Sequence, residues 1–370
     1  MKRNLVKVLF IASLFSISAS SALAMEHSVV KAKVIEVLSE GEEVILDNLT
    51  SSIQNLLILI KEGPAEGKEV EMANDYTPVR KGDSIYVTQN IDEEGSSYSL
   101  YEVNRTPALI FFAILFLVLV FIFGGIQGLR GLLSLGGSLA LIVFVFLPNI
   151  LHGASPVLVS IIVSSIIIIF GSYITHGFNR TTSSAVIGMI ITVLITGFLA
   201  HFAVGATRLN GLGDENALYL SINIGQNIDL LGLLLAGIII GLLGVLYDTA
   251  ISQSIAVEEL IRISPTSDKK HIYKRALRIG REHIGALINT LAIAYVGASL
   301  PLFLLFYSDN SVSHFVSINN EIFVAEIIRT LIGSIGLVLA VPITTFLAVQ
   351  MLHGRTFKSD HGHSHHGHHH

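Results

Sequence analysis

The chain has 370 residues, of which 51% are hydrophobic and 14% charged, and its formal net charge is -5. This composition is too apolar for an ordinary soluble domain, and the acidic balance excludes the basic surface of a nucleic-acid-binding protein. Cysteine is absent, which excludes disulfide bonds, cysteine catalysis and cysteine-ligated metal sites.

Residues 1–24 have the pattern of a secretory signal peptide. Lys2 and Arg3 precede an apolar run from Val8 to Ile17, and small residues end in the cleavage motif Ala22-Leu23-Ala24. The alternative is a retained membrane anchor, although the apolar run is short for a span. Either interpretation places the next segment outside the cell.

Residues 25–104 are charged and rich in turns, with short β-like runs between them. The predicted strands are Val29–Val37, Val44–Asp47, Ile53–Ile60, Glu69–Met72, Ser84–Thr88 and Tyr98–Val103. So many short strands in so few residues suit a small closed barrel. We expect this extracytoplasmic β-barrel-like domain to bind a protein partner or to gate the membrane region.

Seven long apolar stretches fill residues 107–352, and each is long enough to cross a bilayer as a helix. They are Pro107–Gly125, Leu132–Leu151, Pro156–Thr175, Ser184–Gly205, Leu230–Tyr247, Ile284–Phe306 and Ile322–Leu352. The sequence therefore predicts an α-helical polytopic membrane protein of about seven transmembrane helices, preceded by the β-rich domain and followed by a tail at 353–370.

The loop charges predict the orientation of these helices. The connection between the fifth and sixth stretches is strongly basic, with Arg262, Lys269, Lys270, Lys274, Arg275, Arg278 and Arg281. The connections on the opposite side carry few bases. Because cytoplasmic loops accumulate Lys and Arg, the basic connection and the C-terminus are predicted to be cytoplasmic and the β-domain external.

Glycine and proline are frequent inside the apolar stretches. Gly237, Gly241 and Gly244 mark one face of the fifth stretch, where close helix packing is one interpretation and a hinge at a substrate site is the other. Pro148, Pro301 and Pro342 predict kinks.

Polar residues at membrane depth form two candidate groups for a substrate or ion pathway. On the cytoplasmic side, Asp248 is predicted to pair with Arg281, with Asn289 as a hydrogen-bonding neighbour; the alternative is that water alone solvates Asp248.

On the external side, Glu326 and Arg329 are three residues apart on one helix, and Asp229 opens the fifth stretch. A buried cluster of these three residues would bind a substrate or relay a proton; the alternative is a structural ion pair. The solitary His201 is expected to be a packed, hydrogen-bonded residue.

The C-terminal tail is rich in histidine. Imidazole binds zinc, nickel and copper, so the tail is a candidate metal site for adventitious or functional binding. Its ligands would be His361, His363, His365, His366, His368, His369 and His370.

No enzymatic activity and no cofactor are expected. Gly211-Leu212-Gly213-Asp214 and Tyr247-Asp248 have the motif pattern of intramembrane aspartyl proteases. However, the predicted topology places the two carboxylates about a bilayer apart, so they cannot share a proton. Nucleotide-binding, zinc-protease and lipase motifs are missing too.

Several blocks of the sequence resemble the YibE/F-like family of membrane proteins. They are Gly241–Ala256 with Glu258-Glu259-Leu260, Ile279–Gly285 running into Asn289–Tyr295 and Ser299–Pro301, and Glu326–Arg329 leading to Gly333–Pro342. Tyr247 departs from the pattern, which has Met there, and the histidine tail lies outside it. The resemblance implies a multi-pass bacterial membrane protein with an external domain. It adds weight to Asp248, Arg281, Asn289, Glu326 and Arg329 as working positions.

Three functions are compatible with these features. The leading hypothesis is a secondary transporter in the bacterial cytoplasmic membrane, acting on a small solute or ion. The rivals are a non-transporting scaffold or receptor that binds a partner through the β-domain, and a divalent-metal exporter with the tail as sensor. The oligomeric state stays open, a homo-oligomer included.

Overall fold

The computed structural model describes residues 28–46, 49–92, 95–213, 215–223, 228–308 and 313–354. The signal-peptide prediction and the histidine-tail prediction both lie outside these residues. The described chain divides into two compact units between Gly124 and Gly125, and each unit is treated by itself.

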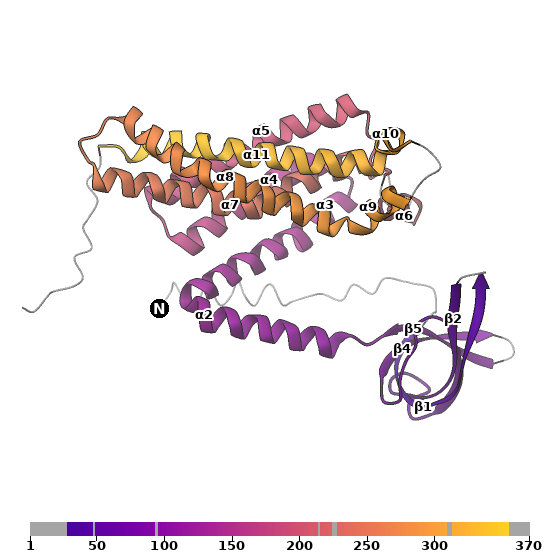
Figure 1. The fold of residues 1–370 in the computed structure, drawn as a ribbon. Helices are drawn as coiled ribbons and strands as arrows, with labels where there is room; N and C mark the ends of the chain where they lie inside the picture. Colours follow the sequence, from indigo (N-terminus) through magenta and orange to yellow (C-terminus); the bar gives the residue numbers. More distant parts are fainter. Residues whose placement is uncertain are drawn as a thin grey trace, which may run out of the picture. The chain divides into compact units, whose positions relative to one another are not determined.

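The first unit is built on one antiparallel sheet with the strand order β3-β2-β1-β4-β5 (Figure 1). Its strands are β1 (Ser28–Leu46), β2 (Leu49–Ile60), β3 (Glu69–Asn74), β4 (Ser84–Asp92) and β5 (Gly95–Val103). Alternate residues such as Val30, Ala32 and Val34 of β1 are buried, as the two-residue period of a strand requires. The sheet curls until its edge strands β3 and β5 come into contact.

Two details of the β-domain differ from the prediction. The strands predicted on either side of Gly41 are one strand, because Gly41 pairs with Ile53 in a long hairpin and does not make a turn. In addition, no hydrogen-bonded ladder joins β3 to β5 among the described residues. The sheet is therefore a curled, five-stranded half-barrel and not a closed barrel of six strands.

Buried Gln54 fixes the segment between β3 and β4. Its side-chain amide accepts a hydrogen bond from the Val79 N–H (2.8 Å) and donates one to the Val79 carbonyl (3.2 Å). Asn74, also buried, donates a hydrogen bond from its side-chain amide to Gln54 Oε1 (3.2 Å). The buried side chains of Gln54 and Asn74 thus both have hydrogen-bond partners.

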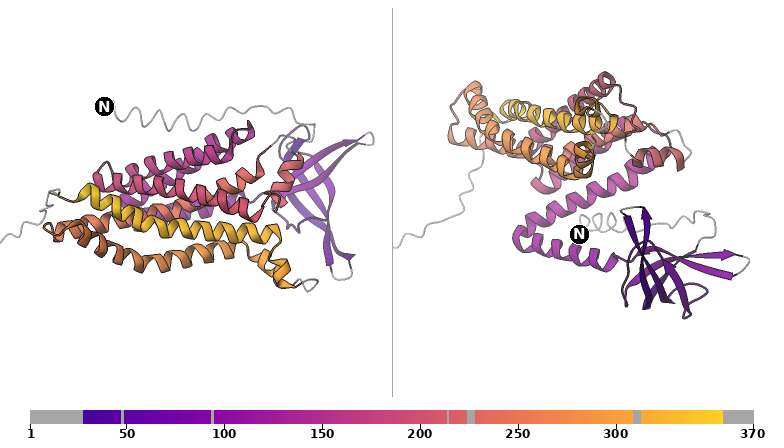
Figure 2. Two further views of the ribbon diagram at one scale, coloured as in Figure 1. Left: turned by 90° about the horizontal axis from the view of Figure 1, so that it is seen from above. Right: turned by 45° about the vertical axis from the view of Figure 1, so that its right-hand side comes forward.

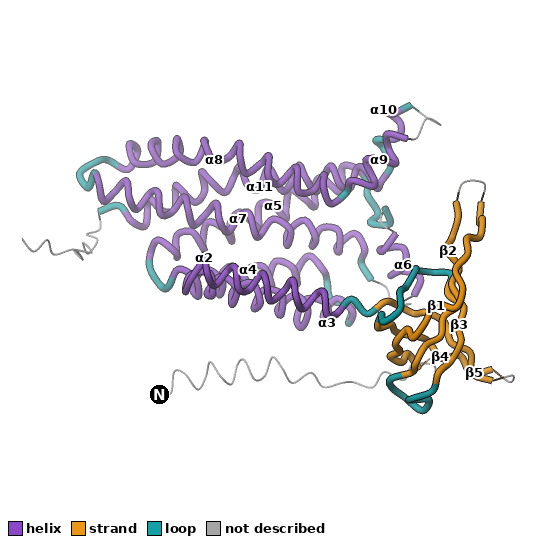
Figure 3. The backbone as a smooth tube through the Cα atoms, turned by 60° about the horizontal axis from the view of Figure 1, so that its bottom comes forward, coloured by secondary structure: helices purple, strands orange, loops and turns teal. Residues whose placement is uncertain are grey.

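The second unit is helical, and α2 (Thr106–Leu141) runs into it from the first (Figure 3). The other helices are the π-helix η1 (Ile142–Phe146), α3 (Leu147–Leu151), α4 (Pro156–His176), α5 (Arg180–Thr207), α6 (Glu215–Asn223), α7 (Leu230–Ile263), α8 (Lys269–Ala298), α9 (Leu300–Ser308), α10 (His314–Ser317) and α11 (Glu321–Leu352).

Five helical segments in the described chain are long and apolar enough to cross a membrane, or six if the bent pair α8–α9 is one span. The first of them, Thr106–Leu151, contains two of the predicted stretches in 46 residues. At about 1.5 Å per residue it would be about 69 Å long, twice a bilayer core. Gly125 interrupts it with a non-helical backbone (φ 52°, ψ -141°). The apolar helices support a membrane-embedded protein, while the predicted number of seven is not confirmed.

Helix α11 is the centre of the bundle, and α5, α7 and α8 pack around it (Figure 2). Small residues make this close approach possible, as is usual for helices in lipid. A Cβ added at Gly188 of α5 would lie 2.5 Å from the Thr344 hydroxyl of α11, and one at Gly336 of α11 would lie 2.5 Å from the Thr196 hydroxyl of α5.

Of the three glycines for which the sequence predicted close packing on α7, only one packs closely against another helix of the described chain. A Cβ at Gly241 of α7 would lie 2.8 Å from the Tyr295 hydroxyl of α8, so the expectation of close packing is confirmed there. Apart from the backbone of α7 itself, no atom of the described chain comes within 4 Å of such a Cβ at Gly237 or Gly244. For these two residues the packing prediction is wrong within the chain itself.

Two of the three prolines disturb their helices. The π-helix η1 comes directly before α3, in which Pro148 has no N–H to donate. Helices α8 and α9 meet next to Pro301 at an angle of 68°. Pro342 is accommodated inside α11, which continues to Leu352. The predicted kink at Pro301 is the one that shapes a cavity.

Candidate functional site

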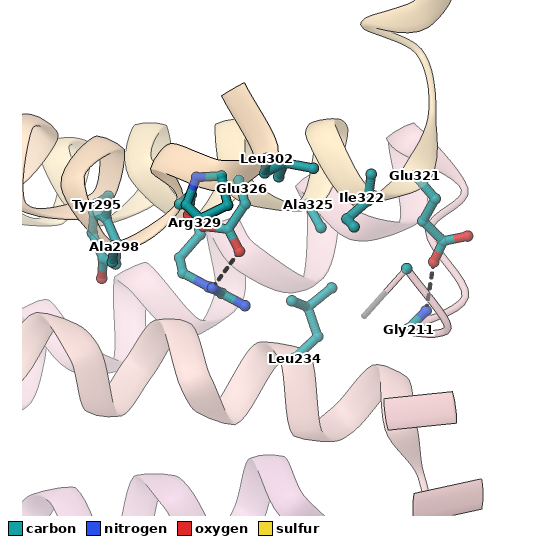
Figure 4. Close-up of a pocket in the computed structure, with 13 residues that line it drawn as sticks. Gly211, Leu234, Tyr295, Ala298, Leu302, Glu321, Ile322, Ala325, Glu326 and Arg329 are labelled. Atoms are coloured by element: carbon teal, nitrogen blue, oxygen red, sulfur yellow. Dashed lines mark hydrogen bonds and ion pairs between the residues drawn. The ribbon is translucent and has the colours of Figure 1, made fainter. Parts of the chain in front are cut away.

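A cavity of about 470 Å³ lies at one end of the helical unit, beside the junction of α8 and α9 (Figure 4). We call this the α9 end; the opposite end, with the connection between α7 and α8, is the basic end. The polar side chains that line the cavity belong to Tyr295, Ser299, Glu321, Glu326 and Arg329. Its apolar lining consists of Leu234, Ala298, Pro301, Leu302, Ile322 and Ala325.

The break between α8 and α9 follows from Pro301. A proline disfavours helical backbone in the residue before it, here Leu300, and it cannot donate a hydrogen bond to the carbonyl one turn earlier. Helix α8 therefore ends at Ala298, and the chain bends by 68° into α9. The bend leaves Ser299 beside the cavity, where its hydroxyl donates a hydrogen bond to Glu326.

Glu326 and Arg329 form an ion pair on α11, with Arg329 Nη1 2.5 Å from Glu326 Oε1. Both side chains are largely buried, with exposed fractions of 29% for Arg329 and 20% for Glu326. Ser299 donates its hydroxyl to the second oxygen of Glu326 (3.2 Å). Both carboxylate oxygens are thus engaged, whereas Arg329 Nε is buried without a hydrogen-bond partner among the described residues.

Glu321 joins the start of α11 to the loop that follows α5. Its Oε1 accepts hydrogen bonds from the backbone N–H groups of Asn210 and Gly211, both at 2.8 Å. Gly211 has a φ of +84°, and a Cβ there would lie 2.7 Å from the backbone of Leu230. Only glycine fits both the backbone conformation and the space. This loop forms one wall of the cavity.

Tyr295 brings a further hydroxyl to the cavity wall. It lies on α8, one helical turn before Ser299, and its phenol interacts electrostatically with Arg329 and Glu326. None of Tyr295, Ser299 and Glu321 was predicted as a site residue from the sequence. The available signal was the polar Ser299 directly before Leu300-Pro301, since polar residues at helix breaks often line sites in membrane proteins.

The third residue predicted for the external cluster is elsewhere. Asp229 is the N-cap of α7, and its carboxylate accepts a hydrogen bond from the Gly232 N–H (2.8 Å). The side chain is exposed and does not line the cavity. The structure therefore brings Glu326 and Arg329 together without Asp229.

The group predicted at the basic end is not assembled either. Asp248, Arg281 and Asn289 are all exposed, and no ion pair or hydrogen bond of the described chain joins Asp248 to Arg281. Asp248 interacts electrostatically with His176 of α4. His201, expected to be packed, is exposed on α5.

A second, smaller cavity of about 130 Å³ lies between the ends of α4 and α5 and helix α7. Glu258 lines it, accepts a hydrogen bond from the Thr181 hydroxyl and pairs with Arg262 at 2.5 Å. Because this carboxylate is already engaged, the cavity offers less to a ligand than the one at the α9 end. Within the described ranges, no three His, Asp or Glu side chains are placed to hold a metal ion.

Comparison with known proteins gives one assignment. No curated protein and no solved structure matches the chain. Residues 112–354, which are more than half of the sequence and include every residue of the α9-end cavity, match the family described as YibE/F-like protein. The resemblance noted in the sequence is thereby confirmed: this chain belongs to the YibE/F-like family.

Proposed function

We propose that this protein is a secondary transporter whose solute site is the cavity at the α9 end. The observation that carries the proposal is the largely buried Glu326–Arg329 pair, which lines a cavity beside a broken helix. Charged groups at membrane depth are costly and usually serve a substrate or ion pathway. Broken helices that meet polar groups are typical of transporter binding sites.

The size and lining of the cavity support a small solute. Small-molecule sites are mostly apolar pockets of about 300–1,000 Å³ with a few placed polar groups. A volume of about 470 Å³ with five polar side chains falls within this description.

The proposed topology has seven crossings, with a reversal near Gly125 and with α8–α9 as one broken span. The basic residues of the α7–α8 connection support a cytoplasmic position for the basic end. The α9-end cavity would then open toward the external face.

Transport by the full-length protein in liposomes tests the proposal. Vesicles that contain the protein would be incubated with a mixture of labelled small metabolites, and uptake would be compared with protein-free vesicles. Replacing Arg329 by Ala should reduce uptake at least about 30-fold, because the change leaves Glu326 buried without its partner charge.

The chain offers a matched control for this variant. Glu102 and Arg105, in the first unit, form an ion pair with the same spacing and the same 2.5 Å distance. Glu102→Gln should leave uptake unchanged. If no solute enters above the background of protein-free vesicles, or if Arg329→Ala transports as well as the parent protein, the proposal is refuted.

A receptor or scaffold is the second candidate, because the edge strands β3 and β5 contact each other but form no ladder in the described sheet, so backbone groups on both edges lack a strand partner. Such edges accept an added strand from a partner protein. Deleting residues 27–100 separates the two functions: a receptor loses its activity, whereas a transporter keeps its uptake. The metal-exporter hypothesis rests on the tail alone, and removing residues 360–370 should then change cellular metal content.

A further inference from the structure

We propose that the α9-end cavity binds a small solute with a carboxylate group and an apolar body, and that binding transfers one proton from water to Glu326. The inference rests on the proposed transport function and names the substrate class and the coupling ion of the same site. It makes the protein a proton-coupled carboxylate transporter.

The hydrogen bonds in the cavity favour an anion over a cation. The oxygens of Glu326 are engaged by Arg329 and by Ser299, and Glu321 Oε1 accepts two backbone N–H groups. Among the described residues that line the cavity, the buried polar atom without a hydrogen-bond partner is a donor, Arg329 Nε. A buried donor left unsatisfied costs free energy, which a ligand with an acceptor oxygen would recover.

The shape of the arginine favours a carboxylate among anions. The pair with Glu326 uses only Nη1, so the edge formed by Nε and Nη2 is not occupied by that carboxylate. Two parallel N–H groups on one edge of a guanidinium match the two oxygens of a carboxylate in a bidentate contact. A point charge such as lysine would not supply this geometry.

The other side chains that line the cavity determine which kind of solute body fits beside the carboxylate. Leu234, Ala298, Leu302, Ile322 and Ala325 present only apolar side chains to the cavity. Figure 4 shows Leu234 facing the ion pair across the cavity, with Ala325 and Ile322 farther along α11. A short aliphatic chain attached to the carboxylate would contact these side chains, whereas a polar body would lose its hydration there without replacement.

Charge balance requires the proton. Arg329 and Glu326 together are neutral, so an incoming carboxylate would leave one excess negative charge beside side chains that are themselves only 29% and 20% exposed. Two carboxylates that share one cation cannot both stay ionised at low cost. One proton from water therefore binds the Glu326 carboxylate, and the Arg329 guanidinium passes to the carboxylate of the solute.

The other groups around Glu326 do not replace it in this step. Tyr295 faces it from α8, Ser299 from the break, and only Leu234 of α7 reaches the cavity. Glu321 is on the same helix, but its carboxylate is held by the loop. Glu326 is thus the acidic group that takes the proton, because it is the carboxylate that Arg329 contacts before it passes to the solute.

Binding to the full-length protein in nanodiscs of uncharged lipid tests the inference. The probes are butyrate, butyramide and butylamine, which share a body and differ in charge. Butyrate should bind at least about 10-fold more tightly than the other two, because it alone satisfies the arginine edge. Titration calorimetry in buffers of different ionisation enthalpy should show that one proton is taken up per butyrate.

Two conservative variants separate a binding role from a structural one. Glu326→Gln keeps the shape and removes the competing charge, so it should bind butyrate as tightly or more tightly, without proton uptake. Arg329→Lys keeps the charge but lacks the two parallel N–H groups of the guanidinium edge, so it should bind butyrate at least about 10-fold more weakly. Glu102→Gln should bind like the parent protein. Gel filtration checks that each variant is folded.

The outcomes distinguish this inference from the transport proposal. If metabolite uptake depends on Arg329 but butyrate neither binds nor competes, the protein is a transporter and the carboxylate assignment is wrong. Preferential binding of butylamine or butyramide would overturn the assignment directly. Butyrate binding without proton uptake would overturn the role of Glu326, and butyrate binding without any flux would overturn the transport function.

Discussion

The packing of α5 against α11 leads to a quantitative prediction for Gly188→Ala. The new Cβ would lie 2.5 Å from the Thr344 hydroxyl and 3.1 Å from Thr344 Cα. Carbon atoms pack at about 3.5–4.0 Å, so the backbone of α11 would have to move. Overpacking of this kind costs about 1–3 kcal/mol, which is a factor of about 5 to 150 in the folding equilibrium.

Gly237→Ala is the matched control for that variant. Gly237 is also a helical glycine in the second unit, but, apart from the backbone of its own helix, no atom of the described residues lies within 4 Å of its added Cβ. Alanine should be neutral there or stabilise the helix by up to about 1 kcal/mol. Unfolding of the purified variants in detergent can be followed by circular dichroism, since the chain has no tryptophan for fluorescence.

The expected result is that Gly188→Ala unfolds at a lower temperature or detergent strength than the parent, while Gly237→Ala does not. Equal stability of the two variants would show that the contact between α5 and α11 is looser than the structure indicates. The same variants leave the cavity residues unchanged, so the comparison concerns packing and not binding.

Three further variants test other contacts. Gln253→Leu should destabilise the bundle by about 1–2 kcal/mol in the same assay, because it removes buried hydrogen bonds to α8 and to Thr345 of α11; unchanged stability would exclude the role. Glu321→Ala should raise amide hydrogen exchange at Gly211, which loses its acceptor, and an unchanged rate there would contradict the assignment. Gln54→Ala should lower the stability of the β-domain by about 1–3 kcal/mol, since it leaves buried backbone groups unpaired; a smaller effect would show that water replaces it.

The membrane character and the family could be predicted because both are local in sequence. Apolar runs set by the thickness of a bilayer are visible without knowledge of their neighbours. The kink at Pro301 was also predictable, since it depends on a single residue and the one before it. The i, i+3 contact of Glu326 with Arg329 followed from helix geometry alone.

The remaining features depend on contacts between distant parts of the chain. Glu321 meets Gly211 across more than a hundred residues, and no helix period connects them. Asp229 was grouped with Glu326 by its depth in the membrane, but a side chain directly before a helix caps that helix when it can. Depth along a helix gives no information about which face a residue occupies, which is why the sequence left open whether Asp248 pairs with Arg281 or is solvated by water alone.

In the β-domain, the error at Gly41 has a similar origin. Glycine predicts a turn when it is needed for a positive φ, and Gly41 is not among the glycines with such a conformation. The long hairpin of β1 and β2 holds it in a strand through its cross-strand partner Ile53. A rule that considers only neighbouring residues cannot predict this pairing with a residue on the next strand.

The central claim is that the Glu326–Arg329 cavity is open to water on the face opposite the basic connection. Because the chain has no cysteine, Leu302→Cys in the cavity and Lys270→Cys in the basic connection provide single labels without further changes. A membrane-impermeant thiol reagent applied to intact cells should label position 302 and leave position 270 unmodified until the cells are permeabilised. Labelling of position 270 alone in intact cells would contradict the account.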